Sequence, residues 1–361
     1  MFSPQSIARS SIYEPYLDGL RGIAILMVLA FHASLELQGK SIFLNFSQVI
    51  ECLSRGVQFF FVISAFTLFR SQQKRSEENW PILAFYLRRA FRILPLWWIV
   101  AILNYVFFNF NNHSASDSFA TAFFLFGFME NGWNICTTPV GWSLFIEESF
   151  YWTFPFWFAK IRSISWSVFA LLASVGVAIL WLKAAAWVGL TEANHFPSVF
   201  PLANYYAFFI GIFLFFVDLQ KWNLKIPPFI LDFCALTGFV GIFYLDRIAG
   251  TFALIPLFVS ASCPQTLFGK LTRMKWLGSF GVCCYSIYLL HPIVTIVTAG
   301  RRVELLRYTH LTDKPIELQL VVWFTCFSIL SLTVGLISFE FIEKPFVRLG
   351  RKVTRGFTKS I

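Results

Sequence analysis

Charged residues are scarce in this sequence of 361 residues. Asp, Glu, Lys and Arg together make up 13% of it, whereas a soluble domain carries about 25%. Hydrophobic residues make up 57%, so there are too few charges to cover a water-facing surface of this size. This balance excludes a single soluble domain and a disordered protein. The apolar runs are continuous, as in FFIGIFLFFV, which indicates membrane-spanning helices and argues against the alternating pattern of a transmembrane β-barrel.

Cysteine patterns typical of zinc sites are also missing. The seven cysteines form no CxxC or Cys/His pattern with zinc spacing, so we expect no metal site. The net charge of +10 would suggest nucleic acid as the partner of a soluble protein. In a chain this apolar we expect no nucleic-acid partner. The basic residues are expected in cytoplasmic loops, in contact with anionic membrane lipid.

A helix that spans a membrane needs about 20 mostly apolar residues. We predict an all-α, polytopic bundle of about ten such helices. The predicted ranges are 22–38, 56–70, 94–111, 143–159, 165–187, 201–218, 226–244, 249–265, 278–298 and 318–340. No internal repeat and no separate soluble domain is apparent in the sequence.

The distribution of Lys and Arg predicts the orientation of this bundle. With the N-terminus inside, 21 of the 29 basic residues fall in inner segments and 8 in outer ones. We therefore expect both termini in the cytoplasm and the protein in the cell inner (plasma) membrane. The outer loops would be 39–55, 111–142, 188–200 and 299–317. Loop 111–142 contains no Lys or Arg, is rich in Asn, Ser and Thr, and ends in Trp142.

Ionisable residues inside a span are costly and are therefore candidates for function. His32 lies in the first predicted span, eleven residues after Arg21. That separation corresponds to about 16 Å of helix rise and almost three turns. Arg21 is then expected at the cytoplasmic surface and His32 near mid-membrane, on one helix face. The alternative is an arginine that extends to the interface and a hydrogen-bonded packing histidine, and the sequence leaves both open.

Two pairs of carboxylates in or beside the predicted spans are candidates for function. Glu147 and Glu148 are adjacent within GWSLFIEESFYW, where two buried like charges would repel each other. The alternative to a functional role is a structural pair bonded to Arg or Trp on neighbouring helices. Glu340 and Glu343 end the last span near the inner interface, where an ion pair with Lys344 or a neighbouring Arg is the simplest explanation.

His291 lies in the ninth predicted span, at a depth similar to that of His32. Pro292 follows it and can free a backbone carbonyl and kink the helix. Tyr285 and Tyr288 lie near the same helix face. A packing role at a proline kink is the alternative.

A cluster of arginines, Arg88, Arg89 and Arg92, precedes the third predicted span on the inner side. Arg88 and Arg92 are four residues apart and share a helix face. Guanidinium forks suit phosphate, but ordinary enrichment of basic residues on the cytoplasmic side explains most such clusters.

Taken in order, these segments closely resemble the acyltransferase-3 family of membrane acyltransferases. The segments that carry the resemblance are YLDGLRGIAILMVLAFH, GVQFFFVISAFTLF, FYLRRAFRILPLWW, GWSLFIEESFYWTFP, YSIYLLHPIV and FIEKPF. Each is weak alone, but six in this order and spacing are specific. The sequence departs from the family at Gln58, where Asp is common, and at Ser64-Ala65, where Ser-Gly is common. A carboxylate role at position 58 is therefore not expected.

The resemblance implies one membrane domain over residues 1–361. Its transmembrane core would lie at about 15–347, followed by a basic cytoplasmic tail at 348–361. Some members of the family carry an appended SGNH-type hydrolase domain. The sequence ends about 14 residues after its Glu-Lys-Pro motif, so we expect no such domain here.

The resemblance also implies a membrane O-acyltransferase. It would move an acyl group, most often acetyl, from cytoplasmic acyl-CoA to a hydroxyl of a cell-envelope saccharide or lipid-linked glycan. Acyl-CoA would be a donor substrate, and no bound cofactor is expected. The residues expected to bind the coenzyme A phosphates are Arg21, Arg88, Arg89 and Arg92.

His32 would act as a general base or a transient acyl carrier, because a buried, neutral imidazole can accept the proton of an attacking hydroxyl. The expected catalytic residues are His32, Glu147, Glu148 and His291. Either glutamate would orient the imidazole of His32 or stabilise its charged form. The residues expected to bind substrate or a developing oxyanion are Trp142, Ser143, Tyr151, Tyr285 and Tyr288.

Two other classes of function fit parts of the pattern. Ten spans, intramembrane charges and a helix broken by proline would also suit a secondary transporter. A non-catalytic membrane partner of a glycan-synthesis complex would need none of the polar residues singled out above. Release of a free thiol from acetyl-CoA would separate the acyltransferase from both.

Overall fold

The protein is described by a computed structural model over residues 14–36, 52–75, 78–107, 113–129, 131–190, 196–217, 226–298, 301–312 and 314–357. Within these ranges the secondary structure is helical throughout and contains no strand, which confirms the predicted all-α class. The parts of predicted loops and spans at 37–51, 108–112, 191–195, 218–225 and 299–300 lie outside the described residues.

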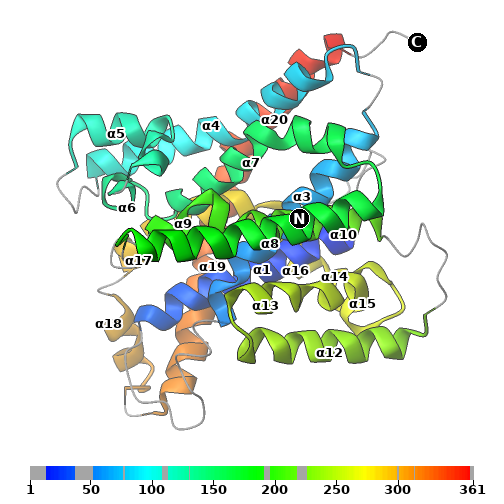
Figure 1. Cartoon of the computed structure of the whole chain (residues 1–361). Helices are drawn as coiled ribbons and strands as arrows, with labels where there is room; N and C mark the ends of the chain where they lie inside the picture. The colour runs from blue at the N-terminus through cyan, green and yellow to red at the C-terminus, as the bar shows by residue number, and fades with distance from the viewer. Residues whose placement is uncertain are drawn as a thin grey trace.

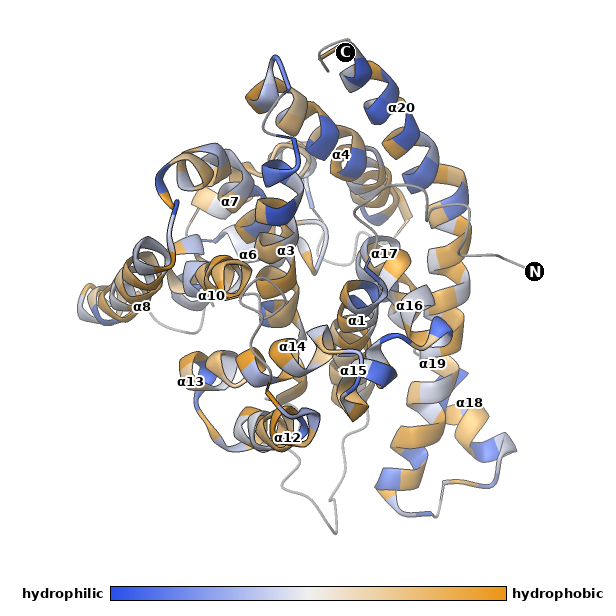
Figure 2. Ribbon diagram, turned by 90° about the vertical axis from the view of Figure 1, so that its right-hand side faces the viewer, coloured by the Kyte–Doolittle hydropathy of each residue, from blue (hydrophilic) through white to orange (hydrophobic). Residues whose placement is uncertain are grey.

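Long helices form the body of the molecule. They are α1 (Pro15–Glu36), α3 (Gly56–Gln73), α4 (Pro81–Phe107), α7 (Gly141–Lys160), α8 (Ile164–Trp187), α10 (Tyr205–Phe216), α12 (Pro228–Tyr244), α17 (Cys284–Thr298) and α19 (Ile316–Ser338). Figure 2 shows α8, α10 and α12 as mostly hydrophobic, while hydrophilic residues concentrate on α4 and α20 (Lys344–Thr354).

Short helices connect these elements. They are α5 (Ala115–Ala122), η2 (Leu125–Phe128), α6 (Gly132–Ile135), α9 (Phe196–Val199), η4 (Pro201–Ala203), α13 (Arg247–Phe252), α14 (Leu254–Ser262), α15 (Leu267–Thr272), α16 (Lys275–Val282), α18 (Arg301–Tyr308), the π-helical turn η5 (Phe339–Glu343) and η6 (Arg355–Phe357). In Figure 1, α5, α6, α9 and α18 lie at the left end of the molecule, and α15 and the C-terminal end of α20 lie at the right. The described parts of three predicted outer loops thus gather at one end.

Among the described residues, five stretches are long and apolar enough to cross a membrane. They are Pro15–Leu35, Cys52–Gln73, Pro81–Phe107, Ile164–Trp187 and Ile316–Thr354. A sixth would be the pair α16 and α17, if these two helices form one span. Each of the ten predicted ranges overlaps a helix or a pair of helices, and the count of ten spans stays a prediction.

Two predicted spans are broken in the structure, where the sequence suggested continuous helices. The range 249–265 is divided between α13 and α14, because Pro256 lacks the N–H that would bond the carbonyl at the end of α13. The range 278–298 is divided between α16 and α17, which meet at an angle of 76°. This break brings α16 close against α1, where a Cβ on Gly22 would lie 2.2 Å from the Leu277 carbonyl oxygen. Glycine therefore lets the two backbones approach closely.

The arginine cluster lies on a helix, as the shared face of Arg88 and Arg92 predicted, but this helix is longer than the predicted span. α4 begins at Pro81, 13 residues before the predicted start at 94, and carries Arg88, Arg89 and Arg92 in its first half. This half of α4 packs along α20 (Figure 1), and a Cβ on Gly350 would lie 2.7 Å from the Cβ of Phe91. α20 thus covers the charged first half of α4, and this half extends the helix beyond the predicted span.

Candidate active site

Two histidines from distant parts of the chain meet inside the bundle. His32 lies near the end of α1 and His291 in the middle of α17, and their ring centroids are 4.6 Å apart with a tilt of 55°. His291 is fully buried. α1 packs against α3, α16, α17 and α19, which holds His32 at this position. The similar depth predicted for the two histidines is thus matched by direct proximity.

The hydrogen bond of His291 assigns its tautomer. Its Nδ1 lies 2.8 Å from the Tyr288 carbonyl oxygen, and a carbonyl only accepts, so Nδ1 carries the proton. That carbonyl is available because Pro292, four residues further on, has no N–H to bond it. Nε2 then carries a lone pair, is buried, and has no hydrogen-bond partner among the described residues. His291 therefore presents a proton acceptor near His32.

Tyr288 connects the histidines to α7. Its ring centroid lies 5.7 Å from that of His291, and its hydroxyl bonds the Ser143 hydroxyl. Ser143 donates its own proton to the Val140 carbonyl at 3.0 Å, so Tyr288 is the donor to Ser143. Tyr285 contacts a different helix, because its hydroxyl donates to the Ile93 carbonyl in α4 at 2.7 Å. The two tyrosines thus tie α17 to α7 and to α4.

Glu147 lies in a separate polar cluster between α3 and α7. Its carboxylate accepts a hydrogen bond of 2.7 Å from Ser64 and another from Tyr151, one turn further along α7. The guanidinium carbon of Arg89 lies 5.4 Å from the centre of the Tyr151 ring. Within the described part of the chain no hydrogen bond joins Glu147 or Glu148 to His32, so their predicted role in orienting that ring stays a prediction.

Glu343 occupies a third polar position, and it is buried. It ends the π-helical turn η5, is 4% exposed, and accepts a hydrogen bond of 2.8 Å from Ser286 of α17. Arg92 of α4 lies within electrostatic range of this carboxylate, and no direct ion pair joins these two described side chains. Glu340, one turn earlier, forms the ion pair with Lys344 that the sequence suggested. Single π-helical turns inside long helices are frequent at functional sites.

Carboxylates already hold two of the four arginines predicted to bind phosphate. Arg21 donates to Asp18 at 2.8 Å, and Arg88 makes a bidentate pair with Glu78, with both bonds at 3.0 Å. This fork geometry is the one in which guanidinium binds phosphate. The first half of α4 and the start of α1 carry Arg21, Arg88, Arg89 and Arg92, a cluster that we call the arginine-rich inner mouth because the sequence predicts it on the cytoplasmic side.

The comparison with known families decides between the classes of function left open above. The acyltransferase-3 family, described as an acyltransferase domain, matches residues 14–340, which include each of the polar clusters above except Glu343. The chain belongs to this family. Its apolar helices and its membership of this family together identify a multi-pass membrane protein.

Several curated relatives in this acyltransferase family are similar over nearly the whole chain. The O-acetyltransferase OatA of Staphylococcus aureus is 26% identical, over 98% of this chain and 59% of that protein. The peptidoglycan O-acetyltransferase OatA of Listeria monocytogenes is 26% identical, over 94% of this chain and 56% of that protein. The chain thus spans about three fifths of the length of these relatives. No solved structure matches the chain.

The candidate site contains residues that the sequence did not single out as functional. Ser64 bonds Glu147, Ser286 bonds Glu343, and Thr67 lies 3.4 Å from Arg21. Each is a small hydroxyl residue within an apolar run, and such residues are also common in membrane helices as plain packing elements. Their partners lie 83, 57 and 46 residues away in the chain, so a single sequence contains no signal that would pair them.

Proposed function

We propose that this protein is a membrane O-acetyltransferase that moves an acetyl group from cytoplasmic acetyl-CoA to a hydroxyl of a cell-envelope saccharide or lipid-linked glycan. The observation that carries the proposal is the contact between His32 and His291, whose open Nε2 can accept a proton. The chain's family and the names of its relatives support acetyl transfer to a glycan. We further propose the inner membrane as its location, because basic residues concentrate on one predicted side.

The donor would enter at the arginine-rich inner mouth. The Arg88 fork holds the Glu78 carboxylate, and a phosphate of coenzyme A would exchange with that carboxylate. Arg89 and Arg92 lie one to four residues deeper along α4, beside Tyr151 and Glu343. A thioester that follows the phosphates inward would approach the histidine pair, where water is excluded by the surrounding helices.

The chemistry at the histidine pair would be acyl transfer with an imidazole as base. As the acceptor hydroxyl attacks the thioester carbonyl, its proton passes to an imidazole nitrogen and a carbon–oxygen bond forms. The carbon–sulfur bond then breaks, and the leaving thiolate takes up the proton as free coenzyme A. The Tyr288 ring lies 5.7 Å from that of His291, and its hydroxyl would stabilise the developing oxyanion by exchanging its hydrogen bond to Ser143 for one to the oxyanion.

A two-step route uses the same residues. The His32 imidazole would attack the thioester directly, release the thiol and carry the acetyl group as an acyl-imidazole. The acceptor hydroxyl would then attack that intermediate, with His291 as the base. Brief mixing with radiolabelled acetyl-CoA, followed by rapid denaturation near neutral pH and removal of free label, would trap the label on the protein only in the two-step route.

Release of free thiol tests the proposed function. Purified protein in liposomes is given acetyl-CoA and an envelope glycan, and the thiol is measured. We expect release and transfer by the native chain and a loss of about 100-fold or more in His32→Ala, because removing a general base costs this much. His113→Ala, at the N-terminal side of α5 beside Asp117, is the matched control and should retain activity. Full activity in His32→Ala, or solute uptake without thiol release, would contradict the proposal.

A further inference from the structure

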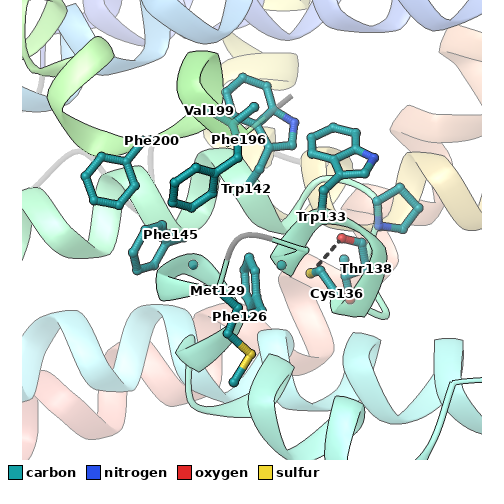
Figure 3. A pocket seen from close by; sticks show the side chains of 13 residues that line it. Phe126, Met129, Trp133, Cys136, Thr138, Trp142, Phe145, Phe196, Val199 and Phe200 are labelled. Atoms are coloured by element: carbon teal, nitrogen blue, oxygen red, sulfur yellow. Dashed lines mark hydrogen bonds between the residues drawn. The ribbon is translucent and has the colours of Figure 1, made fainter. Parts of the chain in front are cut away.

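An aromatic pocket lies at the end of the molecule where the predicted outer loops gather. It is enclosed by η2, α6, α9 and the start of α7, and Figure 3 shows its walls. The residues that line it include Phe126, Met129, Trp133, Trp142, Phe145 and Phe200. Among the described residues, the lining contains no acidic or basic side chain. A phosphate or another charged group would therefore find no counter-charge in this aromatic pocket.

The two tryptophans leave their faces open to a ligand. The rings of Trp133 and Trp142 are 6.2 Å apart and tilted by 36°, so they are splayed and do not stack flat against each other. Trp133 is 40% exposed. It is flanked by Asn131 and Asn134, which are both exposed. Two uncharged hydrogen-bonding side chains are thus exposed near Trp133 in the chain.

Close packing holds the walls of the pocket in place. A Cβ on Gly127 would lie 2.4 Å from the Phe145 ring, and a Cβ on Gly132 would lie 1.8 Å from the Phe126 carbonyl oxygen. Only glycine fits at these two positions without a shift of the wall, so the ring positions depend on the backbone. The ring positions are therefore fixed, and because the enclosed volume is only about 20 Å³, a ligand ring would lie against the open side of the pocket.

The aromatic pocket adjoins the candidate active site through the chain itself. Trp142 lines the pocket, and the next residue, Ser143, bonds Tyr288, whose ring lies 5.7 Å from that of His291. A ligand seated against Trp142 therefore lies beside the polar residues that lead to the histidine pair.

We propose that the aromatic pocket binds one uncharged sugar ring of the saccharide acceptor, with the ring's C–H face against Trp133 and Trp142. This inference rests on the proposed function. A sugar ring combines an apolar face with a rim of hydroxyls, which matches indole faces bordered by amide and hydroxyl side chains. A hydrocarbon chain would not use the exposed Asn131 and Asn134 beside Trp133.

Direct binding without donor tests this inference. The probe is tetra-N-acetylchitotetraose, an uncharged oligosaccharide, titrated by calorimetry into the purified protein in detergent. We expect saturable binding that weakens by about tenfold in Trp133→Ala, because one aromatic contact is worth about that factor. Trp133→Phe keeps an aromatic face and should bind with intermediate affinity. Trp187→Ala, on the exposed end of α8, is the matched control and should bind as the native chain does.

Several results would overturn the inference. They are absence of binding by the native chain, equal affinity in the native chain and in both Trp133 variants, and displacement of the saccharide by a polyprenol in detergent. Because no acetyl-CoA is present, a failure of acetyl transfer would not affect this result. Conversely, Trp133→Ala could transfer acetyl with an unchanged KM for the saccharide. That result would leave the proposed function intact and refute binding of the acceptor in the aromatic pocket.

Discussion

In the imidazole of His291, Nδ1 is hydrogen-bonded and Nε2 has no partner among the described residues. The following residue, Pro292, determines this arrangement. Pro292 frees the Tyr288 carbonyl, that carbonyl takes the Nδ1 proton, and Nε2 is left as an acceptor near His32. The sequence was sufficient to predict a freed carbonyl and two histidines at similar depth. It could not predict the tautomer, because that depends on which group accepts the Nδ1 proton in the folded chain.

Glu343 offers a residue-scale prediction, because it accepts a hydrogen bond from Ser286 and lies within electrostatic range of Arg92. Glu343→Ala should lower the free energy of unfolding by about 1–3 kcal/mol, the cost of leaving the buried Ser286 hydroxyl without its acceptor. Glu343→Gln can still accept the Ser286 hydrogen bond, so most of this stability should return. The negative charge beside Arg92 does not return, and the KM for acetyl-CoA should stay altered. Thermal unfolding and steady-state kinetics measure the two effects separately.

Glu340→Gln is the control for this prediction. It removes a carboxylate one turn away that pairs with Lys344 near the surface. A pair of this kind contributes about 0–1 kcal/mol, so stability and KM should both change little. If Glu340→Gln and Glu343→Gln alter the KM equally, Glu343 has no special relation to Arg92.

At the scale of elements, the breaks between helices position the site. The turn of 76° between α16 and α17 allows α16 to pack on α1 while α17 carries His291 to His32. Hydropathy predicted one continuous span here, because Val282, Cys283 and Cys284 are all apolar. The contact that favours the break is long-range: a Cβ on Gly281 would lie 1.7 Å from the Asp18 carbonyl oxygen of α1. Local composition contains no information about such a contact.

Pro292→Ala tests the role of the proline within α17. The substitution restores a backbone N–H that competes with His291 Nδ1 for the Tyr288 carbonyl. We expect thiol release to fall by about tenfold or more, because the base loses its fixed tautomer. The melting temperature should be equal or higher, since proline inside a helix costs about 3 kcal/mol.

A second proline gives the matched control. Pro95→Ala makes the same change inside α4, away from the histidine pair, and should leave activity near the native value. Native activity in Pro292→Ala, or equal loss in both variants, would show that the tautomer of His291 is not set in this way.

For the whole molecule, amino-acid composition predicted the fold class, and the order of motifs predicted the family. The sequence also identified most polar residues of the site, including His32, Glu147 and His291. It did not predict that the helix carrying Arg88, Arg89 and Arg92 begins as early as Pro81, where α20 packs along α4. It also did not predict the separation of the polar residues into a histidine pair, a Glu147 cluster and a Glu343 cluster. These groupings arise from packing between helices that are far apart in the chain.

The mass of the envelope glycans tests the central claim most directly. Glycans are compared from cells that lack the gene and carry either the native chain or His291→Ala, after the membrane abundance of both proteins is matched by immunoblot. If the histidine pair performs acetyl transfer, the native chain yields a glycan species heavier by one acetyl group, and this species is lost with His291→Ala. The same acetylated glycan at the same abundance in both strains would contradict this claim.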